Sequence, residues 1–140
     1  MKRMLMAVIV GCSLPSWVLA QQAQATYVDA AKVAGGGTFA TAPGYTVQLL
    51  KRTAAGQAEV HTKETDIFYV VEGDATFVTG GRVIGGKETQ PNQIRGEAID
   101  GGETFHLKKG DVVTVPAGVP HWFKAIGQPV SYFTVKSITP

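Results

Sequence analysis

The chain has 140 residues, of which 13 are Lys or Arg and 11 are Asp or Glu, so its formal charge at pH 7 is +2. This length is enough for one domain with one hydrophobic core. Residues 1–20 carry two of the basic residues and none of the acidic ones, so the remainder is neutral. Nucleic-acid binding requires a clustered positive surface, and we therefore expect no nucleic-acid partner.

The first 20 residues have the features of a secretory signal peptide. A short basic start precedes an apolar stretch over residues 4–10, and small or modest side chains stand before a predicted cleavage site between Ala20 and Gln21. The apolar stretch is too short, and too soon followed by Pro15, to span a bilayer as a permanent helix. We therefore expect a periplasmic or secreted protein without an integral membrane span.

An alternative for the leader is lipid attachment. Residues 9–12 resemble a lipoprotein box, in which case Cys12 would carry a lipid and tether the protein. Cys12 is also the only cysteine of the chain. If residues 1–20 are removed, no thiol remains for a disulfide or for thiol catalysis.

Residues 21–44 are predicted to be a lead-in to the domain. A short helix is expected here, with Thr26 as its N-cap and Asp29 in its first turn. The three glycines at residues 35–37 would end this helix after two turns at most.

From residue 45 onward, short stretches of β-branched and aromatic residues alternate with glycine turns, which predicts an all-β domain over residues 45–140. Strands at such short spacing are typical of a small jelly-roll barrel. The expected strands are residues 45–52, 57–61, 66–72, 75–79, 103–107, 111–115, 121–126 and 130–137.

Residues 80–102 are rich in glycine and are predicted to form a long loop. Loops of this length inside a compact domain are usually functional or mobile. We expect this loop to form a lid or wall at one mouth of the barrel, with Arg95 as its most interesting charge. The alternative is that Arg95 is a solvated loop residue.

The stretch from Gly110 to His121 indicates a turn, a buried strand, a rigid turn and the start of a further strand. Gly110 can adopt the positive φ of a tight turn, and residues 112–115 are β-branched. Closely spaced proline and glycine then leave room only for a turn before His121. This spacing predicts that His121 points into the barrel and, by strand alternation, that Phe123 does too.

A second stretch supplies partners for this histidine. Glu59 and His61 are two positions apart and share one face of a strand, and Asp66 rejoins that face if the intervening residues bend. Alternation then places Phe68 and Val70 in the same pocket. An apolar cavity with a few convergent polar groups is the usual form of a small-molecule site.

These two stretches resemble the two motifs of the cupin superfamily. The second motif is Gly, five residues, Pro-x-Gly, two residues, His, three residues, Asn, and the chain departs from it at one position, where Ala125 replaces Asn. The matching residues are Gly110, Pro116, Gly118 and His121.

The first cupin motif is roughly His-x-His, three or four residues, Glu, six residues, Gly, and it is degenerate here. His61 and Gly73 fit the motif, while Glu59 replaces its first histidine and Asp66 replaces its glutamate. The resemblance covers about residues 45–137. It implies a small, single-domain, type-2-like cupin jelly-roll β-barrel, with a homodimer as the expected assembly.

Two imidazoles and two carboxylates on one face suit a divalent metal such as iron, manganese or zinc, and the ligand types do not name the ion. The resemblance implies that Glu59, His61, Asp66 and His121 are the ligands. The alternative is that these residues hydrogen-bond one another in a polar pocket, since buried carboxylates need a partner in either case.

Two functions follow as alternatives. The first is an exported, metal-dependent enzyme, an oxygenase, isomerase or lyase, acting on a small polar organic substrate with the ion as Lewis acid or oxygen activator. The second is a non-catalytic module that binds a small molecule, or a structural cupin, in which the metal has been lost. Fold alone does not decide between them.

Overall fold

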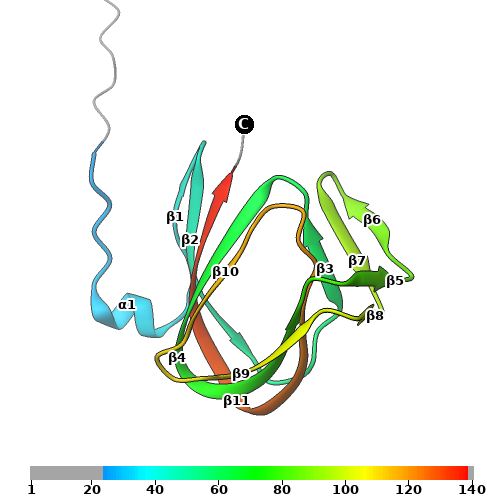
Figure 1. Ribbon diagram of the computed structural model, residues 1–140. Coiled ribbons are helices and arrows are strands. Elements are labelled where there is room, and N and C mark those ends of the chain that lie inside the picture. The colour runs from blue at the N-terminus through cyan, green and yellow to red at the C-terminus, as the bar shows by residue number, and fades with distance from the viewer. Residues whose placement is uncertain (1–23, 139–140) are drawn as a thin grey trace, which may run out of the picture.

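The computed structural model describes residues 24–138. The predicted signal peptide, residues 1–20, and Cys12 lie outside the described residues. The described part is an all-β jelly roll preceded by one short helix, which confirms the predicted fold class (Figure 1). The main sheet curls into a sandwich whose end strands, β1 and β6, each pair on one side, so it is not a closed barrel.

Helix α1 (Ala30–Ala34) precedes the sheet. Asp29 is its N-cap, and the Asp29 carboxylate accepts a hydrogen bond of 2.8 Å from the backbone N–H of Lys32. The prediction of Thr26 as the cap was therefore wrong, because Asp29 has the extended backbone and the side-chain reach that a cap requires. No described helix is long and apolar enough to cross a bilayer.

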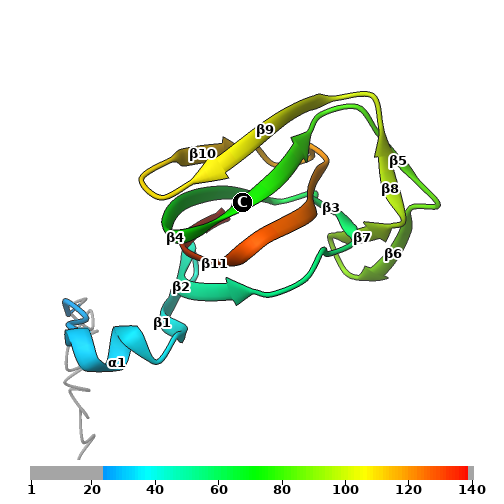
Figure 2. The ribbon, with the colours of Figure 1, turned by 90° about the horizontal axis from the view of Figure 1, so that it is seen from below.

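The strands follow one another with short connections. They are β1 (Gly37–Ala42), β2 (Tyr45–Arg52), β3 (Ala58–His61), β4 (Glu64–Thr79), β5 (Arg82–Ile84), β6 (Lys87–Gln90), β7 (Gln93–Gly96), β8 (Ala98–Asp100), β9 (Glu103–Lys108), β10 (Val112–Val115) and β11 (His121–Ile138). The pairing order in the main sheet is β1-β2-β11-β3-β7-β6, and β4 pairs with β9, β10 and β11. Figure 2 shows β9 and β10 on one side of β4 and β11, with β2 on the other.

Strands β4 and β11 are the longest, and they pair along almost their whole lengths. Each was predicted as two strands separated by a turn. The structure joins them because Gly73, with φ of +79°, bends β4 without ending the pairing, and the register shifts beside it between Ile126 and Tyr132. A Cβ atom at Gly73 would collide with the carbonyl of Pro129.

The region predicted as one long loop, residues 80–102, contains four short strands instead, β5 to β8. Strand β7 pairs with β3, so this region does form a wall of the fold beside the predicted site. The strands were not predicted because each has only three or four residues and glycines interrupt the pattern. Strand β1 was also missed, and it pairs with β2.

The hydrophobic core is built around aromatic rings from β4 and β11. Phe68, Phe77, Phe123 and Tyr132 are buried, and their ring centroids lie 5.0 to 6.0 Å apart. These are favourable separations for aromatic pairs. The core therefore gives the inner face of the jelly roll a rigid floor.

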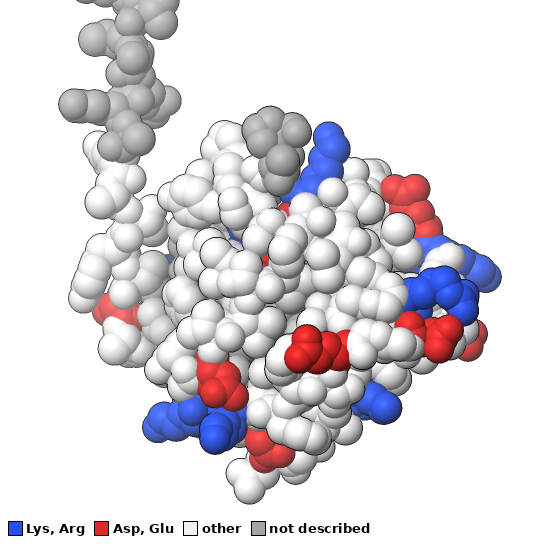
Figure 3. Space-filling view, in the orientation of Figure 1, with Lys and Arg blue, Asp and Glu red and all other residues white. Residues whose placement is uncertain are grey.

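Charged side chains of both signs lie mainly over the lower and right parts of the face shown in Figure 3, with an acidic group near its centre. Exposed apolar side chains are present on the outer faces of β4 and β10. Tyr69 is 48% exposed and Val112 is 64% exposed, and the two residues are cross-strand neighbours.

Candidate functional site

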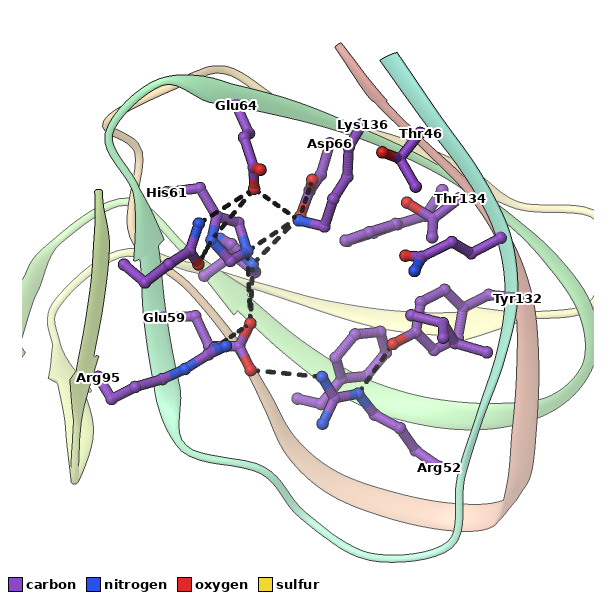
Figure 4. Close-up of a pocket in the computed structure, with 16 residues that line it drawn as sticks. Thr46, Arg52, Glu59, His61, Glu64, Asp66, Arg95, Tyr132, Thr134 and Lys136 are labelled. Atoms are coloured by element: carbon purple, nitrogen blue, oxygen red, sulfur yellow. Dashed lines mark hydrogen bonds and ion pairs between the residues drawn. The ribbon is translucent and has the colours of Figure 1, made fainter. Parts of the chain in front are cut away.

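Four residues predicted as metal ligands line one cavity inside the jelly roll. Figure 4 labels three of them, Glu59, His61 and Asp66. Glu59 and His61 come from β3, Asp66 from the start of β4, and His121 is the first residue of β11. His121 pairs directly with Glu59 across the two strands. Three antiparallel strands thus bring together side chains that lie up to 62 positions apart in the chain.

The Nε2 atoms of the two histidines face the same pair of carboxylate oxygens. His61 Nε2 lies 3.5 Å from Glu59 Oε2 and 3.4 Å from Asp66 Oδ2. His121 Nε2 lies 3.7 Å from Glu59 Oε2 and 3.6 Å from Asp66 Oδ2. Each of the two nitrogens therefore lies within 3.7 Å of both oxygens.

The other ring nitrogens are held by hydrogen-bond acceptors. His61 Nδ1 contacts Gln93 Oε1, and the Gln93 amide nitrogen donates to Glu64 Oε2 at 3.2 Å, so the amide oxygen must face the ring. His121 Nδ1 lies 3.4 Å from the carbonyl of Val119. Both Nδ1 atoms are therefore donors, which leaves each Nε2 directed at the cavity. Histidines that bind metals are usually oriented in this way.

Each carboxylate of the site also has a basic partner. Arg52 Nη2 lies 3.4 Å from Glu59 Oε1, and Arg95 contacts the other oxygen of Glu59. Lys136 Nζ donates to Asp66 Oδ1 at 2.7 Å and to Glu64 Oε2 at 3.2 Å. Arg95 is therefore a partner of Glu59 rather than a solvated loop residue.

Burial and hydrogen bonding shift the pKa values of the two ligand carboxylates in opposite directions. Burial raises the pKa of Glu59, but hydrogen bonds from His121, His61 and Arg95 outweigh it and hold that pKa well below its usual range. The pKa of Asp66 is likewise lowered, because His61 and Lys136 outweigh burial.

The pKa of His61 is raised, whereas those of the two carboxylates are lowered. Burial lowers the pKa of His61, but hydrogen bonds to Asp66 and Glu59 outweigh burial and raise it to about 9. In the protein alone at neutral pH, His61 is therefore a cation between ionised carboxylates.

The cavity beside these residues has a volume of about 360 Å³. Its lining includes Phe68 and Phe123, and Arg95 of β7 lies on one wall. Its other lining residues are Thr46, Gln48, Leu50, Arg52, Glu59, His61, Glu64, Asp66, Gln93, His121, Tyr132, Thr134 and Lys136.

Val70, which was predicted to line the pocket, does not reach it. Val70 is 1% exposed and belongs to the hydrophobic core. Its cross-strand partner Tyr132 lines the cavity instead, so a ring already fills the inner face at this level.

Several residues of the site were missed by the sequence analysis, namely Arg52, Glu64, Gln93, Tyr132, Thr134 and Lys136. Strand alternation could have identified some of them, because residues 132, 134 and 136 are alternate positions of a predicted strand and so lie on the same face. Gln93 was hidden in the region predicted as a loop.

The residues present fit a divalent metal ion. Glu59, His61 and His121 offer donor atoms that lie within 4.8 Å of one another, and His61, Glu64 and Asp66 form a second such group. Imidazole nitrogen and carboxylate oxygen are ligands that iron, manganese and zinc accept. The hydrogen bonds to both Nδ1 atoms add the orientation that such a site needs.

Solved structures support the fold assignment, although at 16% to 17% identity they show the fold alone. The cupin domain of Cnp3 from Schizosaccharomyces pombe is 16% identical, with a TM-score of 0.53, and the alignment covers 74% of this chain and 59% of that one. A protein from Bacillus halodurans is 16% identical, with a TM-score of 0.54 and coverage of 75% and 70%. A protein from Thermus thermophilus is 17% identical, with a TM-score of 0.52 and coverage of 75% and 85%.

No curated protein sequence is significantly similar to this chain. The model of the family described as Cupin matches residues 18–140, which is most of the chain and includes both motifs. Together with the jelly roll and the convergent residues of the two motifs, this match shows that the chain belongs to the cupin family.

Proposed function

We propose that this cupin binds a divalent metal ion through Glu59, His61, Asp66 and His121, and binds a small polar organic molecule in the cavity beside the ion. One observation carries the proposal. Each of the two Nε2 atoms lies within 3.7 Å of the same two carboxylate oxygens, one from Glu59 and one from Asp66. A metal ion requires nitrogen and oxygen donor atoms that lie close together in this way.

A bound ion would supply Lewis acidity to the cavity or activate a bound water molecule. The chain's own residues would orient the ligands around it. Gln93 and the Val119 carbonyl hold the two rings, while Arg52 and Arg95 position the Glu59 carboxylate. Lys136 holds Asp66, so all four donor side chains are kept in place. The side of the cavity lined by Phe68 and Phe123 is left for an organic molecule.

A second candidate is a binding module that works without metal. It is favoured by the basic partners of the site, because Glu59 is paired with Arg52 and Arg95, and Asp66 with Lys136. A buried polar network that is already satisfied does not depend on an ion to remain folded.

Elemental analysis and calorimetry distinguish these candidates. After chelator treatment and dialysis, we expect titration with Zn²⁺ or Mn²⁺ to give one ion per chain. We expect His121→Ala to weaken the affinity more than about 100-fold, since even changes to residues that orient a ligand cost 10–100-fold. His106→Ala, on the exposed face of β9, is the matched control and should bind as the wild type does. Failure of the wild type to bind either ion would favour the metal-free module, and unchanged metal affinity in His121→Ala would show that His121 is not a ligand.

We also propose that the protein is exported, on the signal-peptide features of residues 1–20. N-terminal sequencing of protein recovered from the periplasm or medium should begin at Gln21. Retention of the intact leader inside the cell would contradict export, and a mature chain that begins at a lipid-modified Cys12 would indicate an anchored protein instead.

We further propose a homodimer formed through the outer faces of β4 and β10. The support is a group of exposed apolar side chains, which includes Ile67, Tyr69 and Val112 at 40%, 48% and 64% exposure. A contiguous exposed apolar surface of this kind commonly marks an interface, and symmetric pairs are the commonest assembly.

A further inference from the structure

We infer that the organic molecule bound in the cavity is a small carboxylate, and that Tyr132, Thr134 and Lys136 of β11 hold its carboxylate group. The inference rests on the proposed function, because the metal ion supplies the positive charge that favours an anion. It goes further by naming a chemical class and a set of residues that are not metal ligands.

The three residues form a row on one face of a single strand. They occupy alternate positions of β11, and all three line the cavity (Figure 4). Strand β11 is paired on both sides at this level, with Thr134 opposite Gln48 of β2 and opposite Phe68 of β4. Side chains on such a doubly paired strand are held at fixed positions, as a preorganised binding site requires.

Thr134 is the most informative member of the row. It is 1% exposed, and its Oγ1 has no hydrogen-bond partner among the described residues. A buried hydroxyl without a partner is costly, so native proteins rarely keep one without a functional reason. Because this hydroxyl belongs to a residue that lines the cavity, a bound molecule is the partner it fits.

Its two neighbours also have donors left over. Tyr132 accepts a hydrogen bond of 2.9 Å from Arg52 Nε, so the Tyr132 hydroxyl proton is still available. Lys136 Nζ donates to Asp66 and Glu64, and an ammonium group has a third N–H. The row therefore offers three donor groups on residues that line one wall of the cavity, and a carboxylate, which only accepts, is the complementary group.

The charge of the site also favours an anionic ligand such as a carboxylate. Three carboxylates are matched by three basic side chains, so the site alone is close to neutral when its histidines are neutral. The residues are Glu59, Glu64 and Asp66 against Arg52, Arg95 and Lys136. A divalent ion bound to neutral histidines leaves the buried site with two positive charges, and an anionic ligand offsets them because Coulomb interactions are strong there. Metal and carboxylate should therefore bind cooperatively.

The cavity limits the size of the anion. Its volume of about 360 Å³ corresponds to roughly a dozen water molecules. The rings of Phe68 and Phe123 on the floor suit a flat or apolar stem. Benzoate and succinate are therefore suitable probes, and benzamide and succinamide are their uncharged counterparts.

Calorimetric titration of these four probes tests the inference. Zn²⁺ is titrated first without any organic probe, and each probe is then titrated into zinc-loaded and chelator-treated protein. We expect at least one carboxylate to bind the zinc-loaded protein at least about 10-fold more tightly than its amide does, and more tightly than it binds the metal-free protein, as a lost hydrogen bond to a charged group implies.

Variants assign the effect to the row on β11. Thr134→Val should weaken carboxylate binding about 10-fold and leave the zinc affinity unchanged, and Tyr132→Phe should weaken carboxylate binding by a similar factor. Thr134→Ser keeps the hydroxyl and should retain binding, which separates a lost contact from a misfolded chain. Thr104→Val, on the exposed face of β9, is the matched control.

The possible failures are distinguishable. If the wild type does not bind Zn²⁺ in the absence of a probe, the proposed function is wrong, and this inference with it. If zinc binds at one ion per chain but neither carboxylate binds more tightly than its amide, only the carboxylate inference is overturned. Unchanged carboxylate binding in Thr134→Val would overturn the assignment of the row.

Discussion

His61 has a hydrogen-bond acceptor at each ring nitrogen. Gln93 Oε1 faces Nδ1, and carboxylate oxygens of Glu59 and Asp66 face Nε2. Only the doubly protonated ring can donate at both positions, which explains why the pKa of His61 is raised to about 9 although burial opposes it. A metal ion must therefore displace a proton that the protein holds firmly.

This raised pKa predicts how stability depends on pH in the metal-free protein. The unfolded value is about 6.5, so the stabilisation is fully present below pH 6.5 and is lost as pH rises through about 9. The free energy of unfolding should fall by up to roughly 3 kcal/mol across this window. Urea unfolding of chelator-treated protein at a series of pH values measures it.

His61→Asn should remove this slope, whereas His106→Asn should keep it, since His106 is exposed outside the cavity. A wild-type profile that stays flat between pH 6.5 and 9 would show that His61 is not held as a cation.

The sequence alone predicted the residues that the two motifs contain, and the structure brings all four of them together. It did not predict their basic partners. Arg52 and Lys136 lie at strand ends, where a solvated charge is the usual expectation, and only the pairing of β2 and β11 around the cavity shows that they face inward. Which carboxylate a basic side chain meets depends on tertiary packing rather than on local pattern.

At the level of elements, the bend of β11 positions the site, because this strand contributes His121 and Phe123 before the bend and Tyr132, Thr134 and Lys136 after it. Gly73 bends β4 between the level of Asp66 and that of Phe77. A glycine between two β-branched runs usually indicates a turn, which is why two strands were predicted. Here it is a kink inside one strand, since its neighbours find partners on β11 before and after the bend.

Gly73→Ala should therefore be strongly destabilising. The φ of +79° is unfavourable for alanine, and its Cβ would collide with the Pro129 carbonyl. We expect a loss of more than about 2 kcal/mol in the free energy of unfolding, measured by urea denaturation.

Gly118→Ala is the matched control for this experiment. Gly118 has a similar φ of +82°, but a Cβ there would meet no atom within 4 Å. Its cost should be limited to about 1–2 kcal/mol of backbone strain. Equal losses in the two variants would contradict the collision as the cause.

At the scale of the whole molecule, the jelly roll has a polar inner end and an apolar outer face. The fold class was predictable from the spacing of short strands and glycine turns, and the second motif placed the start of β11. The strands between residues 80 and 102 were not predictable from the sequence. Strands of three or four residues are defined by their partners rather than by their own composition.

The exposed apolar side chains on the outer faces of β4 and β10 predict a homodimer. Sedimentation or light scattering should give the mass of a dimer, and Val112→Lys should shift it to that of a monomer, because a buried, unpaired charge would disrupt the interface. Ile84→Lys, at another exposed apolar position on β5, is the control and should stay dimeric. A monomeric wild type would show that the apolar face is free in solution.

The packing of Trp122 has a practical consequence. The indole N–H of Trp122 donates a hydrogen bond of 2.7 Å to the carbonyl of Gly56. Trp122 directly follows His121 in the chain. The other tryptophan of the sequence is Trp17. A protein expressed from Gln21 onward would thus have one tryptophan, next to a candidate ligand in the chain. Quenching of its emission by a paramagnetic ion would report occupancy without any added dye.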